Sequence, residues 1–363
     1  METLIDRIRQ AAKEYNSNPR KDLRNCQPCK EKMRNKMQEQ ILQDRAAAFT
    51  GKIVVIMPVR DEGIRALETV RNLRASKAPG TDLHFFIVND GSTDGCCDVF
   101  AQNKPRDITL IHAPQDGGHC RQIGQGVARS LAVYQNPDAD GFYSIDAHET
   151  MDTRYGIERL VLQAQATGGF IMARSLNLAK NRANVGVGCR LGVTGAGESL
   201  RLKGIWLREG EADETGMIPV KILCGACYAF TPLAWNTVGG CHESYGLYGM
   251  FDIDLSIAAR FCGLPIHCDA DVKSAHWYRV KRPYTMSGRW KWWAWVECYR
   301  SMFRPEIFAQ VFEPAARNIA FKLKDPMLAW LLETPRFIPI QAEFETRKKV
   351  DDKEVLNWLG IKY

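Results

Sequence analysis

The chain has 363 residues, of which 45% are hydrophobic and 25% are charged, as in an ordinary globular protein. It has no run of 18 apolar residues that could span a membrane, and its mixed-charge start, METLIDRIRQAAKEY, has no apolar region of a secretory signal. We therefore expect a cytoplasmic protein. The net charge of +7 indicates either an anionic partner or a solvated surface with a small excess of lysine.

Residues 1–50 are polar, and Lys and Arg outnumber Asp and Glu there, so we expect a helical N-terminal arm. From Lys52 to Pro58 the chain is almost continuously apolar, which predicts a strand buried on both faces. The apolar spacing that follows predicts a helix over 64–76.

Three further strands are predicted over 83–88, 108–111 and 141–145, with a helix over about 120–134 before the last of them. This alternation favours an α/β fold with a doubly wound, mostly parallel sheet. Ligands bind such sheets at the carboxyl ends of the strands. Three of the four strands end there in polar loops: Arg60-Asp61-Glu62, Asn89-Asp90 and Asp146-Ala-His148.

Two common nucleotide-binding motifs are missing from the sequence. No GxGxxG follows the first strand, which argues against a dinucleotide-binding oxidoreductase. The GxxxxGK[ST] motif of P-loop NTPases is also missing, which argues against that class of enzyme.

Asp146 and His148 are two residues apart at a strand end, so their side chains point to the same side. A carboxylate with an imidazole suits Mn²⁺ better than Mg²⁺, and such an ion could neutralise a diphosphate leaving group. The alternative is an Asp that caps a helix beside a surface His.

Twelve cysteines are scattered along the chain, and without an export signal we expect no disulfides. The pairs Cys26/Cys29 and Cys224/Cys227 have the spacing of zinc ligands. Buried or spare thiols are the interpretation that we favour.

Four short motifs follow one another along the chain: Pro58-x-x-Asp61-Glu62, Asn89-Asp90-Gly-Ser, Gly118-x-x-Arg121 and Asp146-x-His148. This order resembles the GT-A fold glycosyltransferases, family 2 and its relatives. Three later segments extend the resemblance: ILCGACYAF (222–230), YGMFDIDLS (248–256) and AHWYRVKRPY (275–284). With these, the chain looks most similar to the catalytic domain of polypeptide N-acetylgalactosaminyltransferases.

The resemblance implies a hexosyl- or N-acetylhexosaminyltransferase that uses a UDP-sugar donor. It implies a Mn²⁺ ion, or another divalent cation, on Asp146, His148 and His276. The donor would contact Pro58, Arg60, Glu62, Asp90, Arg121, Gly225, Ala226, Tyr248 and Tyr284. The catalytic residues would be Asp252, Asp254 and Arg279, with Arg279 offsetting diphosphate charge.

The stereochemical outcome stays open at this stage. The polypeptide-transferase pattern has Gly-Glu-Asn where this chain has Met250-Phe251-Asp252. In the inverting family 2 pattern Asp252 would be the catalytic base, but it could also simply cap a helix. The sugar and the oligomeric state are likewise not given by the sequence.

For the acceptor we place hydroxymethylated pyrimidine in DNA slightly ahead, as in phage transferases that take a flipped-out base; the cytoplasm would then be that of the host. A protein Ser/Thr and a polysaccharide or lipid precursor are alternatives, as is a non-catalytic nucleotide-sugar or nucleic-acid binding protein. Residues 286–304 interleave basic and aromatic side chains, which could stack bases. We favour a core helix there.

These observations divide the chain into three parts. We expect the helical arm at 1–50, a GT-A glycosyltransferase domain at 51–305 and a C-terminal extension at 306–363. The Gly-rich, charged segment 177–217 is interpreted as an insertion on the acceptor side.

Overall fold

The computed structural model describes residues 27–103, 105–113, 115–116, 119–120, 125–223, 226–240, 251–280 and 288–363. Four predicted donor residues lie outside this part of the chain: Arg121, Gly225, Tyr248 and Tyr284. Cys26 and Cys224 lie outside it too, so the zinc hypothesis stays a prediction.

The chain forms two compact units, Met1–Arg45 and Ala46–Tyr363. The described residues of the first unit belong to helix α2 (Gln27–Ala47), which ends just inside the second. The second unit contains all the described strands and the predicted site residues within the described part.

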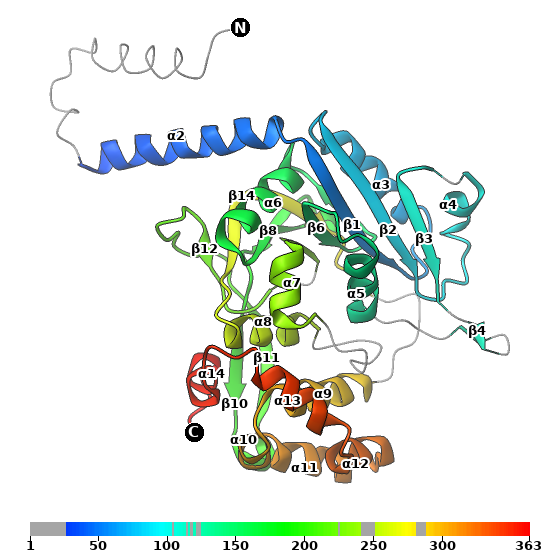
Figure 1. Ribbon diagram of the computed structural model, residues 1–363, viewed down its shortest axis with the longest axis vertical. Helices are drawn as coiled ribbons and strands as arrows, with labels where there is room; N and C mark the ends of the chain where they lie inside the picture. Colours follow the sequence, from blue (N-terminus) through cyan, green and yellow to red (C-terminus); the bar gives the residue numbers. More distant parts are fainter. Residues whose placement is uncertain are drawn as a thin grey trace, which may run out of the picture. The chain divides into compact units, whose positions relative to one another are not determined.

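A mixed sheet runs through the second unit (Figure 1). Its strand order is β12 (Ile218–Pro219), β14 (Ile266–His276), β8 (Phe170–Asn177), β13 (Cys227–Phe230), β6 (Gly141–Ile145), β1 (Gly51–Val59), β2 (Thr81–Asn89) and β3 (Ile108–His112). Strands β6, β1, β2 and β3 are mutually parallel, as are β14 and β8. Strand β13 is antiparallel to both of its neighbours and joins the two parallel groups. The predicted strands and the mostly parallel sheet are confirmed.

The strand β1 is apolar from Ile53 to Val59, and its side chains enter a core on each face of the sheet. Ile53, Val55 and Met57 enter one core with α3 (Arg65–Ser76) and α6 (Gly156–Thr167). The alternate residues Val54 and Ile56 enter a second core with α5 (Gln125–Gln135). Side chains of a strand alternate between faces, so each β1 residue stabilises one of the two cores.

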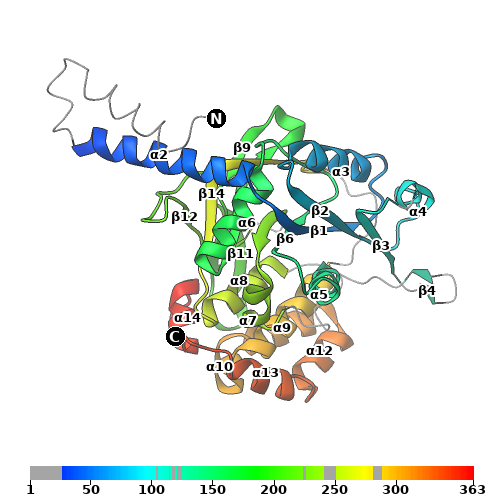
Figure 2. The same cartoon turned by 45° about the horizontal axis from the view of Figure 1, so that its top comes forward.

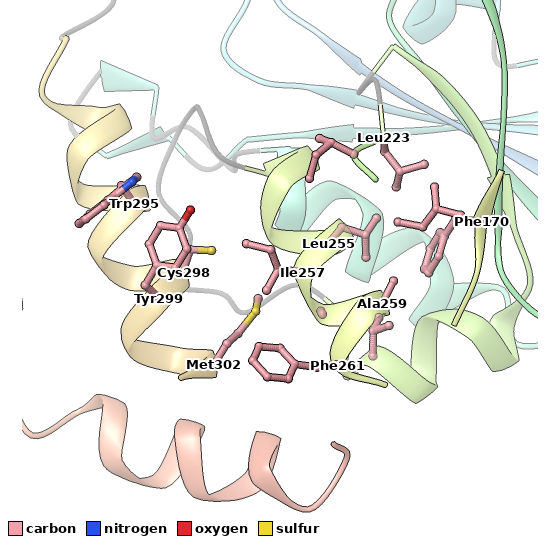
Figure 3. Packing of buried hydrophobic residues seen from close by; sticks show 14 of the residues in the cluster. Phe170, Leu223, Leu255, Ile257, Ala259, Phe261, Trp295, Cys298, Tyr299 and Met302 are labelled. Atoms are coloured by element: carbon pink, nitrogen blue, oxygen red, sulfur yellow. The ribbon is translucent and has the colours of Figure 1, made fainter. Parts of the chain in front are cut away.

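The second core continues through α7 (Pro232–Val238), α8 (Phe251–Phe261) and α9 (Trp290–Met302). In Figure 3, Ile257 and Phe261 of α8 face Tyr299 and Met302 of α9. Trp295 and Tyr299 are buried, which confirms the core interpretation for these two side chains.

Residues 306–363 are helical and contribute to the same core. They form α10 (Pro305–Val311), α11 (Glu313–Leu323), α12 (Pro326–Glu333), α13 (Phe337–Glu345) and α14 (Asp352–Leu359). Phe312, Leu331 and Leu356 are buried in one cluster with Phe230 of the sheet. The C-terminal segment is therefore part of the second unit's packing.

The segment 177–217 forms strand β9 (Ala183–Gly186), paired with β8, and a hairpin of β10 (Cys189–Thr194) and β11 (Arg201–Trp206). The hairpin tip contacts α11, where the Asn318 amide donates to the Glu198 carbonyl at 3.0 Å. The remaining elements are α4 (Asp98–Asn103), β4 (Gln115–Asp116), β5 (His119–Cys120), β7 (Glu149–Met151) and two short 3₁₀ turns. No helix in the described ranges has the length and apolar character needed to cross a bilayer.

Candidate active site

Three ligand-type side chains meet where β6 and β14 end. Asp146 and His148 follow β6, and His276 is the last residue of β14. One ligand atom from each lies within 4.8 Å of the other two. The chain brings them together because β7, next to His148, pairs antiparallel with the end of β14. The predicted metal set is thus assembled in space, although His276 is 128 residues beyond His148 in the sequence.

Asp146 and His276 form an ion pair, with 3.1 Å between Oδ2 and Nε2. Burial opposes the charge on Asp146, but the hydrogen bond and the positive charges of His276, His148 and Arg129 hold its pKa below the ordinary value. Burial also opposes the charge on His276, whereas the bond to Asp146 and the negative charge of Glu149 raise its pKa. A cation that binds here would therefore compete with the proton of His276.

The donor set fits a divalent cation. It offers one carboxylate and two imidazoles, the ligands of borderline ions such as Mn²⁺. The Nδ1 atom of His276 is buried, and among the described residues it has no hydrogen-bond partner. A buried polar atom without a partner is costly. The other ring nitrogen, Nε2, faces the Asp146 carboxylate, on the side where a cation would bind.

Glu62 contacts His148, one of the two histidines of the metal set. Its Oε2 atom lies 3.1 Å from Nδ1 of His148 and accepts a hydrogen bond from Arg279. Arg279 also approaches Nδ1 of His148 at 3.1 Å. This nitrogen can donate to Glu62 or accept from Arg279, depending on its tautomer. When it donates to Glu62, the Nε2 lone pair is left for a cation.

The loops after β1 and β2, where the donor was predicted to bind, are tied to each other. The Asp61 carboxylate accepts from the Thr93 backbone N–H at 2.7 Å, and the Asp61 N–H donates to the Ser92 hydroxyl at 3.2 Å. The Gly63 N–H donates to the Asp94 carboxylate at 2.8 Å. These bonds place the half-exposed Arg60 and Asp90 on adjoining loops at one edge of the sheet.

The predicted sugar-side and acceptor-side residues lie on β13 and α8. The Ala226 carbonyl accepts from the Asp146 N–H at 3.1 Å, so the start of β13 lies directly beside the metal set. Asp252 and Asp254 are in the first turn of α8. Asp254 is buried, whereas Asp252 is partly exposed.

Two residues near the site were not predicted from the sequence. Arg129 of α5 is fully buried, donates to the Ser144 hydroxyl at 2.8 Å, and its charge lowers the pKa of Asp146. The guanidinium carbon of Arg65 lies 3.4 Å from the centroid of the Trp277 ring. The ring centroids of Trp277 and His148 are 6.4 Å apart. A lone Arg in the apolar helix segment was the available signal for Arg129.

Comparisons with known proteins identify a similar sequence family and a similar fold. Residues 54–179 match the model of the family described as "Glycosyl transferase family 2". A crystal structure of GalNAc-T7 with UDP, GalNAc and Mn²⁺ superposes with a TM-score of 0.62 at 12% identity, covering 85% of this chain. The chain spans little more than half (56%) of the length of that structure.

Two further structures resemble the chain more distantly. The mannosyltransferase PcManGT from Pyrobaculum calidifontis, with GDP-Man and Mn²⁺, has a TM-score of 0.45 at 16% identity, covering 83% of this chain and 75% of its own. S. aureus TarS 1–349, with UDP-GlcNAc, has a TM-score of 0.48 at 12% identity, covering 85% of this chain and 83% of its own. Among curated proteins, none matches the chain.

The family match covers the part of the chain that contains most of β1, all of β2 and the Asp146/His148 pair, and the fold match extends over 85% of the chain. Residues 54–179 therefore match family 2 glycosyltransferases, within a chain that has the GT-A fold of these enzymes.

Proposed function

We propose that this protein is a metal-dependent glycosyltransferase that moves a sugar from a UDP-sugar to an acceptor hydroxyl. The observation that carries the proposal is the convergence of Asp146, His148 and His276 beside the loops at the ends of β1 and β2. A metal set placed at that edge of a GT-A sheet is where a nucleotide diphosphate would bind.

Asp146, His148 and His276 would hold the cation, which supplies Lewis acidity that stabilises the diphosphate leaving group. Arg279 would contribute a second positive charge, since its guanidinium can leave Glu62 for a phosphate oxygen. Arg60 and Asp90 would contact the nucleoside. The start of β13 at Ala226 would let the sugar approach the metal set.

Of the two acidic residues in α8, Asp252 is the better candidate for a general base. Asp254 is buried beside Tyr299, whose phenol has its pKa raised by burial and by the charges of Cys298 and Asp254. A base must reach the acceptor hydroxyl, and the more exposed Asp252 meets that condition. The substitution Asp252→Asn should abolish sugar transfer. The substitution Asp254→Asn should mainly lower the stability of the fold.

The proposal for the acceptor is less specific than the proposal for the donor. Hydroxymethylated pyrimidine in DNA stays the first acceptor to test, supported by the net charge of +7. The burial of Trp295 and Tyr299 removes one argument for base stacking. A protein Ser/Thr and a polysaccharide or lipid precursor therefore belong in the same assay.

The test is UDP release from a panel of UDP-sugars, with and without Mn²⁺, by the full chain and by the Asp146→Ala/His148→Ala variant. A matched control is Asp213→Ala/His267→Ala, which removes another Asp–His pair, 2.9 Å apart, outside the site. We expect Mn²⁺-dependent release that the control retains and the site variant loses. Donor binding without turnover on any acceptor would favour the non-catalytic alternative. Absence of both hydrolysis and a UDP/Mn²⁺ melting shift would refute the proposal.

A further inference from the structure

Exposed large hydrophobic side chains gather in one short stretch of the second unit. Phe321, Leu323, Met327 and Trp330 all lie within ten residues, at the end of α11 and along α12. Phe321 is 83% exposed. Single exposed apolar residues are common on protein surfaces, but several of them close together on two successive helices are typical of an interaction site. We call these four residues, with Lys322 and Lys324, the α11–α12 face.

Helix α12 is apolar over its first seven residues and ends in Glu333. Its sequence from Pro326 to Leu332 is PMLAWLL, without one polar residue. Leu328, Leu331 and Leu332 are buried against the protein, whereas Met327 and Trp330 point outward at 43% and 49% exposure. Apolar helix residues are normally buried, yet Met327 and Trp330 are partly exposed on the outer side of α12.

The exposed charges near the turn between α11 and α12 are those of two lysines, and Glu333, the exposed carboxylate at the end of α12, pairs with Arg317 at 3.5 Å. Lys322 and Lys324 are exposed, and within the described ranges neither has an ion-pair partner. The nearby Asp325 faces inward: it is buried and accepts from the Trp293 indole at 3.0 Å and from the first N–H groups of α12. The exposed charge at the turn between α11 and α12 is therefore that of Lys322 and Lys324.

We infer that the α11–α12 face docks on an anionic lipid surface. Aromatic side chains favour the boundary between lipid headgroups and acyl chains, and lysines beside them attract acidic headgroups. The turn at Lys324 and Asp325 allows Phe321, Met327 and Trp330 to enter the interface while both ammonium groups stay at headgroup level.

A second copy of the chain fits this face less well. A two-fold contact brings the same patch of both copies together, which would oppose Lys322 and Lys324 to the same residues of the partner. An anionic bilayer neutralises these charges instead. In both views of the second unit, α11 and α12 lie with α9 and α13, away from strands β1–β3 (Figures 1 and 2). The donor loops are therefore not part of this face.

The test is flotation of the full chain with vesicles of phosphatidylcholine alone and of equal parts phosphatidylcholine and phosphatidylglycerol. We expect binding to the anionic vesicles only, weakened by salt. Both Phe321→Ser/Met327→Ser and Lys322→Glu/Lys324→Glu should lower the partition coefficient about tenfold or more. The first pair is exposed in the structure, so the fold should be kept.

Matched controls are Tyr134→Ser/Leu233→Ser, which removes two exposed hydrophobic side chains elsewhere, and Lys180→Glu/Lys203→Glu, which makes the same charge change elsewhere. These should bind vesicles as the unchanged chain does. UDP release without vesicles should be equal in all five proteins, so a failed docking experiment does not bear on the proposed function.

Three outcomes would overturn the inference: no binding to anionic vesicles, equal loss in the control variants, or unchanged binding by the face variants. Concentration-dependent dimerisation that Phe321→Ser/Met327→Ser abolishes would identify the face as a contact between copies. Loss of duplex DNA binding in Lys322→Glu/Lys324→Glu, with no vesicle binding, would identify a nucleic-acid surface.

Discussion

Glu62 links the first loop of the sheet to the metal set, since the same carboxylate oxygen faces His148 and Arg279. A carboxylate behind a metal-binding histidine fixes its tautomer and ring orientation. The resemblance had suggested that Glu62 contacts the nucleoside. The geometry favours a positioning role, because its side chain is buried against these two residues.

We predict that Glu62→Gln weakens Mn²⁺ binding by about 10–100-fold, as is usual when a supporting partner of a metal ligand is lost. Isothermal titration of the purified chain with Mn²⁺ measures this directly. Glu68→Gln, on the exposed side of α3, is the control and should bind as before. Equal affinity of the Glu62 and Glu68 variants would mean that Glu62 does not position His148.

Cysteine reactivity gives a second prediction at this scale. Burial raises the pKa of Cys189 to about 12, helped by the charge of Asp252, and burial raises the pKa of Cys262 to about 11. Only the thiolate reacts, so at about pH 8 well under one per cent of either thiol is reactive. Peptide mapping after iodoacetamide should show both unlabelled in the folded protein and labelled in urea. Rapid labelling of either without denaturant would contradict the structure.

The site residues differ in how far the sequence could identify them. Asp146 and His148 are two residues apart at a strand end, so their spacing alone predicts a joint site. His276 could be assigned only through the family resemblance, because the β7–β14 pairing that delivers it is a long-range contact. The role of Arg129 depends on how α5 packs on the sheet, which periodicity does not reveal.

Among the elements, strands with continuous apolar runs were predictable, and β1 and β2 match their expected positions within two residues at each end. The antiparallel β13 was not identified as such, because strand direction depends on the connection rather than on composition. The hairpin of β10 and β11 was missed for a related reason. Its Gly-rich, charged strands are half-exposed and stabilised by pairing with each other.

Helix α6 is fastened to β14 by a buried ion pair. Arg159 donates two hydrogen bonds to Asp269, at 2.6 and 3.0 Å, and both side chains are almost fully buried. Removing one partner leaves a buried charge without compensation, so Arg159→Met should cost about 3–5 kcal/mol. Urea unfolding followed by circular dichroism gives this value.

The exposed pair Arg182–Asp152 is the control for that measurement, since the Arg182 side chain is 52% exposed. Arg182→Met should cost at most about 1 kcal/mol. If the two Arg→Met variants unfold at the same urea concentration, the Arg159–Asp269 pair does not fasten the helix to the sheet.

At the scale of the whole molecule, the C-terminal extension predicted at 306–363 packs on the predicted glycosyltransferase domain. The sheet and the five C-terminal helices share one hydrophobic core. Residues 306–363 gave no interpretable motif because the apolar residues of short helices are divided among several contacts. The division after Arg45 falls near the end of α2, so all but the last two residues of this helix belong to the other unit.

Truncation should therefore have opposite effects at the two ends. The fragment 46–363 should unfold cooperatively in urea, with a midpoint close to that of the full chain. The fragment 1–305 loses Phe312, Leu331 and Leu356 from the core. At about 1.5–3 kcal/mol for each buried side chain, these three residues alone match much of the roughly 5–15 kcal/mol that stabilises a domain. We expect fragment 1–305 to aggregate or to unfold without a cooperative transition. A cooperative transition of 1–305 at the midpoint of the full chain would instead establish 306–363 as a separable extension.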